Sequence, residues 1–158
     1  MTADPHPLDL LRAEARTATV PEVRRELDAL SARQAEVLNS PHWGAGAEDT
    51  LRASIGMGRK MTMEMRLGLG DDWAALPLRK TAPLAEMTLP DLLAEARAGR
   101  EHLLQVLDSL LRTAQHREVR AWCYGEEVPP ELYILGLRRR LAALDSRVAG
   151  ARNADMTG

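Results

Sequence analysis

The sequence predicts an all-α protein, an up-and-down four-helix bundle with a long crossover loop, and three observations support this prediction. Aromatic residues make up only 3% of the chain, phenylalanine is absent, and no stretch sustains the alternation typical of strands. Leu, Ala, Arg, Glu and Met dominate, and all of them are good helix formers. Long segments carry apolar residues at spacings of three and four. The 158 residues suit a single domain, 1–158, and we expect its core at about 19–149 with flexible ends.

The helix starts are marked by a repeated capping pattern. Thr19 and Thr88 are each followed by a proline and then, three residues after the threonine, by Glu22 or Asp91. A threonine cap, a proline in the first turn and an early acidic residue all stabilise the beginning of a helix. These signals, with the prolines before Glu131 and the glycines near 68 and 70, predict helices over about 7–17, 21–38, 47–67, 90–115 and 130–149.

The predicted helices carry apolar stripes that would face one another in a bundle. The stripe of the 90–115 helix consists of Leu89, Leu92, Leu93, Ala96, Leu103, Leu107, Leu110 and Ala114. The stripe of the last helix consists of Ile134, Leu137, Leu141, Leu144 and Val148, with Leu132, Leu135 and Ala142 beside it. The connections over 68–87 and 116–129 are predicted to be loops at the ends of the bundle, where functional contacts often gather.

The segment "SIGMGRKM" contains two glycines inside a predicted helix, and each costs about 1 kcal/mol relative to alanine. We interpret Gly56 and Gly58 as positions where a neighbouring helix packs closely, since Ser54 lies on the same face as Gly58. In this interpretation methionines fill the remaining space. The alternative is that these glycines border a ligand.

A dense group of methionines follows in the same helix, at Met57, Met61, Met63 and Met65. Methionine fills irregular gaps and suits adaptable interfaces, so the group indicates a packed core or a subunit contact. A pocket for an apolar ligand is the alternative. The residues that would line it are Trp43, Ser54, Met57, Met61 and Trp122.

The four histidines show no spacing of three or four that would place two imidazoles on one helix face. We therefore expect no metal and no other cofactor, and the sequence assigns no catalytic residue. The alternative is a divalent-metal site assembled in three dimensions from His42, Glu64 and His102.

The single cysteine, Cys123, lies between two aromatic residues and excludes a disulfide framework within the chain. We interpret it as a buried or half-buried loop thiol. The arginines at 138–140 are interpreted as a solvated face that flanks the core stripe.

The overall charge and hydropathy favour a cytoplasmic protein that binds neither nucleic acid nor membrane. The net charge is −2, whereas nucleic-acid binders carry a basic excess. No apolar run approaches the roughly 20 residues of a membrane span. The first residues lack the basic-then-apolar order of a signal peptide.

Three segments together resemble the DinB/YfiT-like helical-bundle superfamily over about 19–149. "LDALSARQAEVLNSPHWGAGAEDTLRASIGMGRKMTMEMRLGLG" is similar to the N-terminal half of that family, with a Leu-Ser helix end and a tryptophan-glycine turn. "MTLPDLLAEARAGREHLLQVLDSL" resembles its third helix, and "VPPELYILGLRRRLAALDSR" occupies the place of its fourth.

The resemblance implies a four-helix bundle that holds a divalent metal such as zinc or nickel with three histidines. One histidine comes from the second helix and two come from an HxxxH pair on the fourth. It also implies homodimers, and relatives that are thiol-dependent transferases or isomerases or stress-induced proteins. This chain departs from the pattern, because Arg52-Ala53 stands where the first histidine belongs and Met57-Gly58 stands where a Trp-Glu pair is common. The segment 131–148 contains no histidine, so none of the three ligands can be transferred to this chain.

Three functional hypotheses follow. The first is a metal-free, non-catalytic DinB-like homodimer with a binding or stress-associated role. The second is a thiol-dependent transferase or hydrolase-like metalloenzyme whose altered site uses His42, Glu64 or His102. The third is a module that binds a small hydrophobic ligand.

Overall fold

A computed structural model describes residues 6–70 and 82–153 of the chain. Within these ranges the protein is mostly helical, in agreement with the predicted all-α class, and the only sheet has two short strands. The elements are α1 (Pro7–Glu14), α2 (Val20–Leu38), α3 (Ala47–Leu69), the 3-10 helix η2 (Leu84–Glu86), α4 (Leu89–Thr113), β1 (Ala121–Cys123), β2 (Glu126–Val128) and α5 (Pro130–Asn153).

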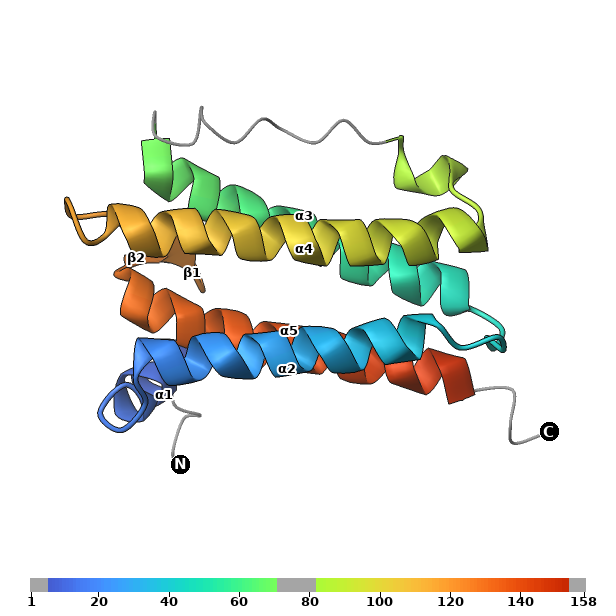
Figure 1. Ribbon diagram of the computed structural model, residues 1–158, viewed down its shortest axis with the longest axis horizontal. Helices are drawn as coiled ribbons and strands as arrows, with labels where there is room; N and C mark the ends of the chain where they lie inside the picture. The colour runs from blue at the N-terminus through green and yellow to red at the C-terminus, as the bar shows by residue number, and fades with distance from the viewer. Residues whose placement is uncertain (1–5, 71–81, 154–158) are drawn as a thin grey trace.

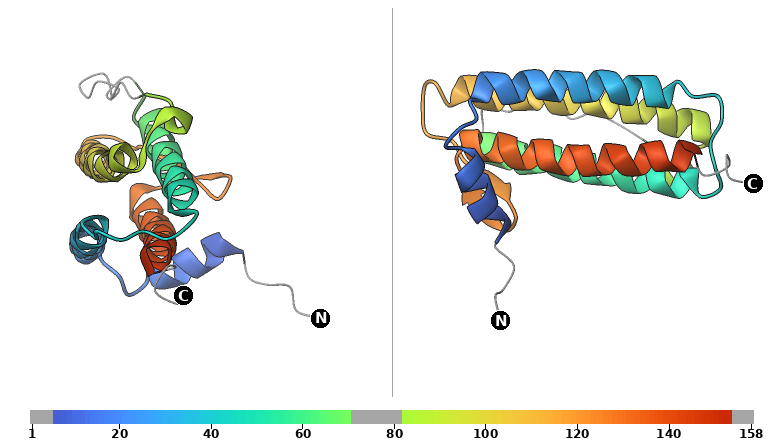
Figure 2. Two further views of the ribbon diagram at one scale, coloured as in Figure 1. Left: turned by 90° about the vertical axis from the view of Figure 1, so that its right-hand side faces the viewer. Right: turned by 90° about the horizontal axis from the view of Figure 1, so that it is seen from below.

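The four long helices lie side by side along the longest axis of the molecule (Figures 1 and 2). Helix α3 packs on α4 and α5, helix α2 packs on α5 and α4, and α1 lies across one end against α5. Helices α3 and α4 point in the same direction, so the four long helices do not alternate as a simple up-and-down order requires (Figure 1). Residues 71–81 of the predicted crossover lie outside the described ranges.

The predicted helix starts are confirmed at the level of individual hydrogen bonds. The backbone N–H of Glu22 donates to Thr19 Oγ1 at 3.4 Å, and the N–H of Thr88 donates to Asp91 Oδ2 at 3.2 Å. Both contacts satisfy backbone donors that have no partner within the first turn of a helix. The predicted helices therefore begin within one residue of their observed starts.

The predicted loop over 116–129 contains a β-hairpin that the sequence analysis missed. Strands β1 and β2 pair antiparallel, with Ala121 opposite Val128, and β1 packs against α3 and α5. Tyr124 and Gly125 form the turn with φ angles of 51° and 81°. Two consecutive positive φ angles are typical of a type I′ turn, which is rarely built on a tyrosine. Three-residue strands are too short to show alternation, and this hid the hairpin.

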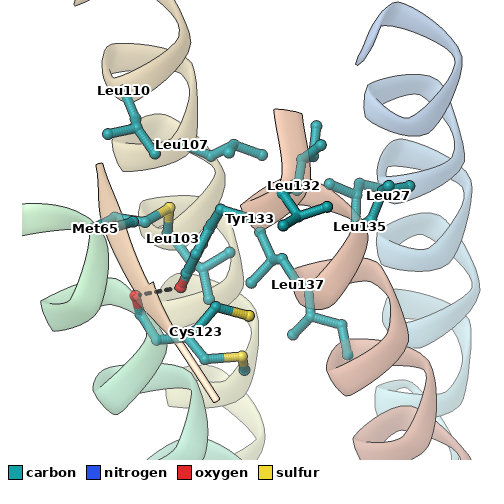
Figure 3. Close-up of a cluster of buried hydrophobic side chains, with 14 of the residues drawn as sticks. Leu27, Met65, Leu103, Leu107, Leu110, Cys123, Leu132, Tyr133, Leu135 and Leu137 are labelled. Carbon is teal, nitrogen blue, oxygen red and sulfur yellow. Dashed lines mark hydrogen bonds between the residues drawn. The ribbon is translucent and has the colours of Figure 1, made fainter. Parts of the chain in front are cut away.

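The apolar core is divided into two clusters. The larger one spans the four long helices, the hairpin and α1. Leu8 and Leu11 of α1 are fully buried in it, so the core begins before the predicted 19–149 segment. Figure 3 shows part of it, with Tyr133 inserted among leucines and its hydroxyl donating to the Met61 carbonyl oxygen at 3.0 Å. The smaller cluster consists of Leu38, Leu51, Ile55, Met87, Leu92, Ala96 and Val148. All five residues of the predicted α5 stripe are buried, whereas Ala142 beside it is exposed.

Among the described residues, no helix is both long enough and apolar enough to cross a membrane.

Candidate functional site

A pocket of about 220 Å³ lies between α3 and α4, at the level where the two core clusters meet. Side chains of α3 and α4 form its walls, and Gln34 of α2 with Leu141 and Leu144 of α5 lies beneath them. Its apolar lining consists of Ile55, Met63, Ala96, Leu103, Leu141 and Leu144. Its polar lining consists of Gln34, Ser54, Arg59, Thr62, Arg66, Glu95, Arg100 and His102.

Glycines on the two facing helices contribute to this space, because Gly58 and Gly99 both line the pocket. A Cβ atom added at Gly58 would meet nothing within 4 Å, and the same holds at Gly56. The interpretation of these two glycines as close-packing positions is therefore wrong. At Gly58 the missing side chain leaves open space that the neighbouring methionines do not fill.

Close approach occurs instead at two other glycines. A Cβ at Gly68 would lie 1.8 Å from the backbone oxygen of Arg120, where the segment before β1 crosses α3. A Cβ at Gly136 would lie 2.6 Å from the Sγ atom of Cys123. These glycines let the hairpin pack against α3 and α5.

A buried polar layer lies beneath the pocket and separates the two core clusters. Arg100 of α4 donates to Asp145 of α5 through two bonds of 2.6 and 3.1 Å, and the two side chains are 7% and 12% exposed. Gln34 donates to the same carboxylate at 3.2 Å. A buried ion pair of this kind contributes little net stability, because desolvation of the charges offsets their attraction. The polar layer therefore points to a role other than stabilising the core.

Two polar contacts lie across the α3–α4 groove, one toward each end of the pocket. Arg59 Nη2 donates to Glu95 Oε1 at 3.4 Å. Arg66 Nη2 lies 2.9 Å from His102 Nε2. Because a guanidinium only donates, the contact is a hydrogen bond when Nε2 of the ring is the acceptor. Arg66 is only 2% exposed, and this burial lowers the pKa of its guanidinium.

A second polar cluster lies near the hairpin and is centred on Arg140. Its Nη1 donates to Glu64 Oε1 at 2.9 Å, and the Tyr133 hydroxyl donates to the same oxygen at 2.9 Å. The guanidinium lies 5.5 Å from the ring centres of Tyr124 and Tyr133, a cation–π distance, and 3.7 Å from the Cys123 Sγ atom.

The interpretation of residues 138–140 as a solvated face is thus wrong for Arg140, whose side chain is held in this cluster and is only 14% exposed. Arg138 and Arg139 lie toward the surface, where both pair with Glu14 of α1. The short helix α1 therefore lies against α5 and forms ion pairs with two of the three arginines.

The thiol of Cys123 is fully buried in strand β1 and not in a loop. Burial raises its pKa, an effect that the nearby Arg140 charge only partly opposes. Burial also raises the pKa of Tyr133. A nucleophilic cysteine needs a lowered pKa, and burial shifts the pKa of Cys123 in the opposite direction.

The structure places the predicted pocket residues in different parts of the molecule. Only Ser54 lines the pocket between α3 and α4. Trp43 packs against the smaller core cluster, and Met61 is buried in the larger one. Met57 and Trp122 are exposed.

The three residues of the alternative metal site are not gathered together. His42 is exposed in the loop before α3, Glu64 binds Tyr133 and Arg140, and His102 contacts Arg66. Across residues 6–70 and 82–153, no group of three or more His, Cys, Asp or Glu side chains is placed to hold a metal ion.

Apart from Ser54 and His102, the polar residues around the pocket were missed, although the sequence carries a signal for two of them. Arg100 lies four residues after Ala96 and three before Leu103. This spacing makes position 100 a core position of the α4 stripe. Gln34 occupies the equivalent place between Leu30 and Leu38 of α2. Polar side chains at core positions of two helices indicate a polar layer in the bundle.

No family model matches the chain, and neither a curated protein nor a solved structure is found to be similar to it.

Proposed function

We propose that this protein binds a small molecule in the pocket between α3 and α4. The observation that carries the proposal is the open space beside Gly58. This space adjoins the buried ion pair of Arg100 and Asp145. It also adjoins two polar contacts between α3 and α4, Arg59 with Glu95 and Arg66 with His102. Ligand pockets combine apolar walls with a few convergent polar groups, and this pocket has that composition. Its 220 Å³ is below the roughly 300–1,000 Å³ of pockets for drug-sized molecules, so the ligand is small.

The cost of the site supports a binding role. Each glycine inside α3 lowers the stability of the helix by about 1 kcal/mol relative to alanine. A buried ion pair adds little net stability to the fold. A bundle selected for stability alone would place alanine at Gly58 and apolar side chains at Arg100 and Asp145. Retaining this arrangement is expected where the space and the charges serve a ligand.

A thermal-shift screen tests the proposal with three forms of the protein. Wild type, Gly58→Leu and the control Gly56→Leu are each melted with a library of compounds of about 6 to 12 non-hydrogen atoms, in line with the small volume. A leucine at position 58 would occupy the pocket, whereas position 56 does not line it. We expect compounds that raise the melting temperature of wild type and Gly56→Leu but not of Gly58→Leu. Identical responses of all three forms would reject the pocket as the binding site.

A second candidate is an enzyme with an altered site, and one observation favours it: Glu95 and His102 line the same pocket. Carboxylate and imidazole are the usual groups for general acid–base catalysis. Metal analysis of the purified protein after dialysis against a weak chelator tests the metal-dependent form of this candidate. About one zinc or nickel ion per chain favours a metalloenzyme, and a metal content far below one ion per chain rejects that form.

We further propose that the fold is a DinB/YfiT-like four-helix bundle whose metal site has been lost. The support comes from the three quoted segments and from the four long helices lying side by side. The proposal includes a homodimer formed through α3, where Met57, Met63 and Leu67 are exposed. It also includes a cytoplasmic, stress-associated role. Sedimentation velocity tests the dimer, and a single species of monomer mass at micromolar concentration would reject it.

A further inference from the structure

We propose that the pocket ligand is a small carboxylate whose charged group is bound by Arg59 and whose compact apolar body lies against the apolar residues of the lining. This inference rests on the proposed binding function and adds the chemical class of the ligand. The observations that lead to it are the arginines in the lining, the position of Arg59 and the group of buried apolar side chains in the same lining.

The polar lining is rich in hydrogen-bond donors. Arg59, Arg66 and Arg100 all border the pocket, and each guanidinium supplies five N–H donors and no acceptor. Glu95 is the one carboxylate among the described lining residues. A carboxylate suits such a lining, because it supplies two acceptor oxygens that match a planar guanidinium.

Arg59 is the guanidinium best placed to receive the ligand. Arg100 is already held by two bonds to Asp145, whereas Arg59 makes a single hydrogen bond among the described residues. That bond to Glu95 is 3.4 Å long, well beyond the roughly 2.7–2.9 Å of a strong charge-assisted bond. The Arg59 side chain is also 36% exposed, so a carboxylate bound there keeps part of its hydration.

The apolar part of the lining defines the rest of the ligand. Leu103, Leu141 and Leu144 are buried in the lining together with Ile55 and Ala96, so the part of the ligand that meets them is short and apolar. The volume of about 220 Å³ favours a single ring or a short branched chain. Glu95 opposes an anion by its charge, and its 3.4 Å contact with Arg59 is weak enough for a ligand carboxylate to compete with it.

Calorimetric titration with three compounds of nearly equal shape tests the inference: benzoate, benzyl alcohol and benzylamine. We expect benzoate to bind wild type at least about tenfold more tightly than benzyl alcohol, as one charge-assisted bond provides. Benzylamine should bind more weakly still. Arg59→Gln should reduce benzoate affinity about tenfold and leave benzyl alcohol within about twofold. Glu95→Gln should leave benzoate affinity equal or higher, because it removes a like charge. Arg25→Gln is the control, because Arg25 is exposed on α2 and does not line the pocket. It should leave the affinities for all three compounds unchanged.

The possible outcomes separate this inference from the function on which it rests. If benzyl alcohol or benzylamine binds as tightly as benzoate, or Arg59→Gln has no effect on benzoate, the carboxylate assignment is wrong and the pocket remains. If none of the three binds while the thermal-shift screen finds neutral or cationic compounds lost in Gly58→Leu, the assignment is wrong as well. If no compound in either experiment depends on Gly58, the proposed function itself falls.

Discussion

Substituting alanine for glycine along α3 and α5 should produce effects of opposite sign. At Gly56 and Gly58 a Cβ atom meets nothing within 4 Å, so the only large effect is the better helix propensity of alanine. We expect Gly56→Ala and Gly58→Ala each to raise the free energy of unfolding by about 1 kcal/mol. In a domain of this size such a change raises the melting temperature by about 2–4 °C.

At Gly68 the added Cβ would lie 1.8 Å from the Arg120 backbone oxygen and 2.9 Å from its carbonyl carbon. Backbone atoms cannot rotate away, so the substitution must push the segment before β1 off α3. We expect Gly68→Ala to lower the free energy of unfolding by about 1–3 kcal/mol, the usual cost of overpacking. Gly136→Ala should also be destabilising, but less so, because its nearest neighbour is the Cys123 side chain.

Urea denaturation followed by circular dichroism at 222 nm measures all four variants against wild type. The midpoint should rise for the substitutions at 56 and 58 and fall for those at 68 and 136, with an unchanged slope. A lower urea midpoint for Gly58→Ala than for wild type would contradict the open space beside Gly58. It would mean that a neighbouring helix fills the space beside Gly58 and that no pocket exists there.

Three further predictions follow from the buried polar groups. Asp145→Ala should lower the free energy of unfolding by about 3–5 kcal/mol because Arg100 is left as an uncompensated buried charge, whereas the double variant Arg100→Met/Asp145→Leu should be close to wild type in chemical denaturation. Tyr133→Phe removes the hydroxyl that donates to Met61 and Glu64 and should cost about 1–3 kcal/mol; an unchanged urea midpoint would contradict the contacts. Burial raises the pKa of Cys123 in the folded protein above its ordinary value of about 9.0, so the unfolded chain releases this proton first and stability should fall as pH rises above 9. Cys123→Ala should reduce that slope, and an equal slope in both proteins would show that the thiol is not involved.

The helices could be predicted from the sequence because their signals are local. Thr19 and Thr88 mark their helix starts through contacts only three residues away, and the α5 stripe from Ile134 to Val148 is visible as a simple spacing. The relative directions of α3 and α4 are not local, since they depend on which ends of the molecule the chain joins.

The pocket could not be predicted because a glycine in a helix can either permit close packing or leave an open space. Gly68 and Gly136 permit close contact, whereas Gly58 leaves a space, and nothing within one turn distinguishes these cases. The buried role of Arg140 was hidden for a similar reason. It adjoins two arginines that pair with Glu14, and only the three-dimensional approach of Glu64 and Tyr133 separates it from them.

A crystal structure of the wild-type protein soaked with a cocktail of small carboxylates and neutral compounds tests directly whether the pocket binds a ligand. We expect electron density for a bound compound between α3 and α4, beside Gly58, Gly99, Leu141 and Leu144. A structure in which side chains close this space, with compounds bound only elsewhere, would contradict it.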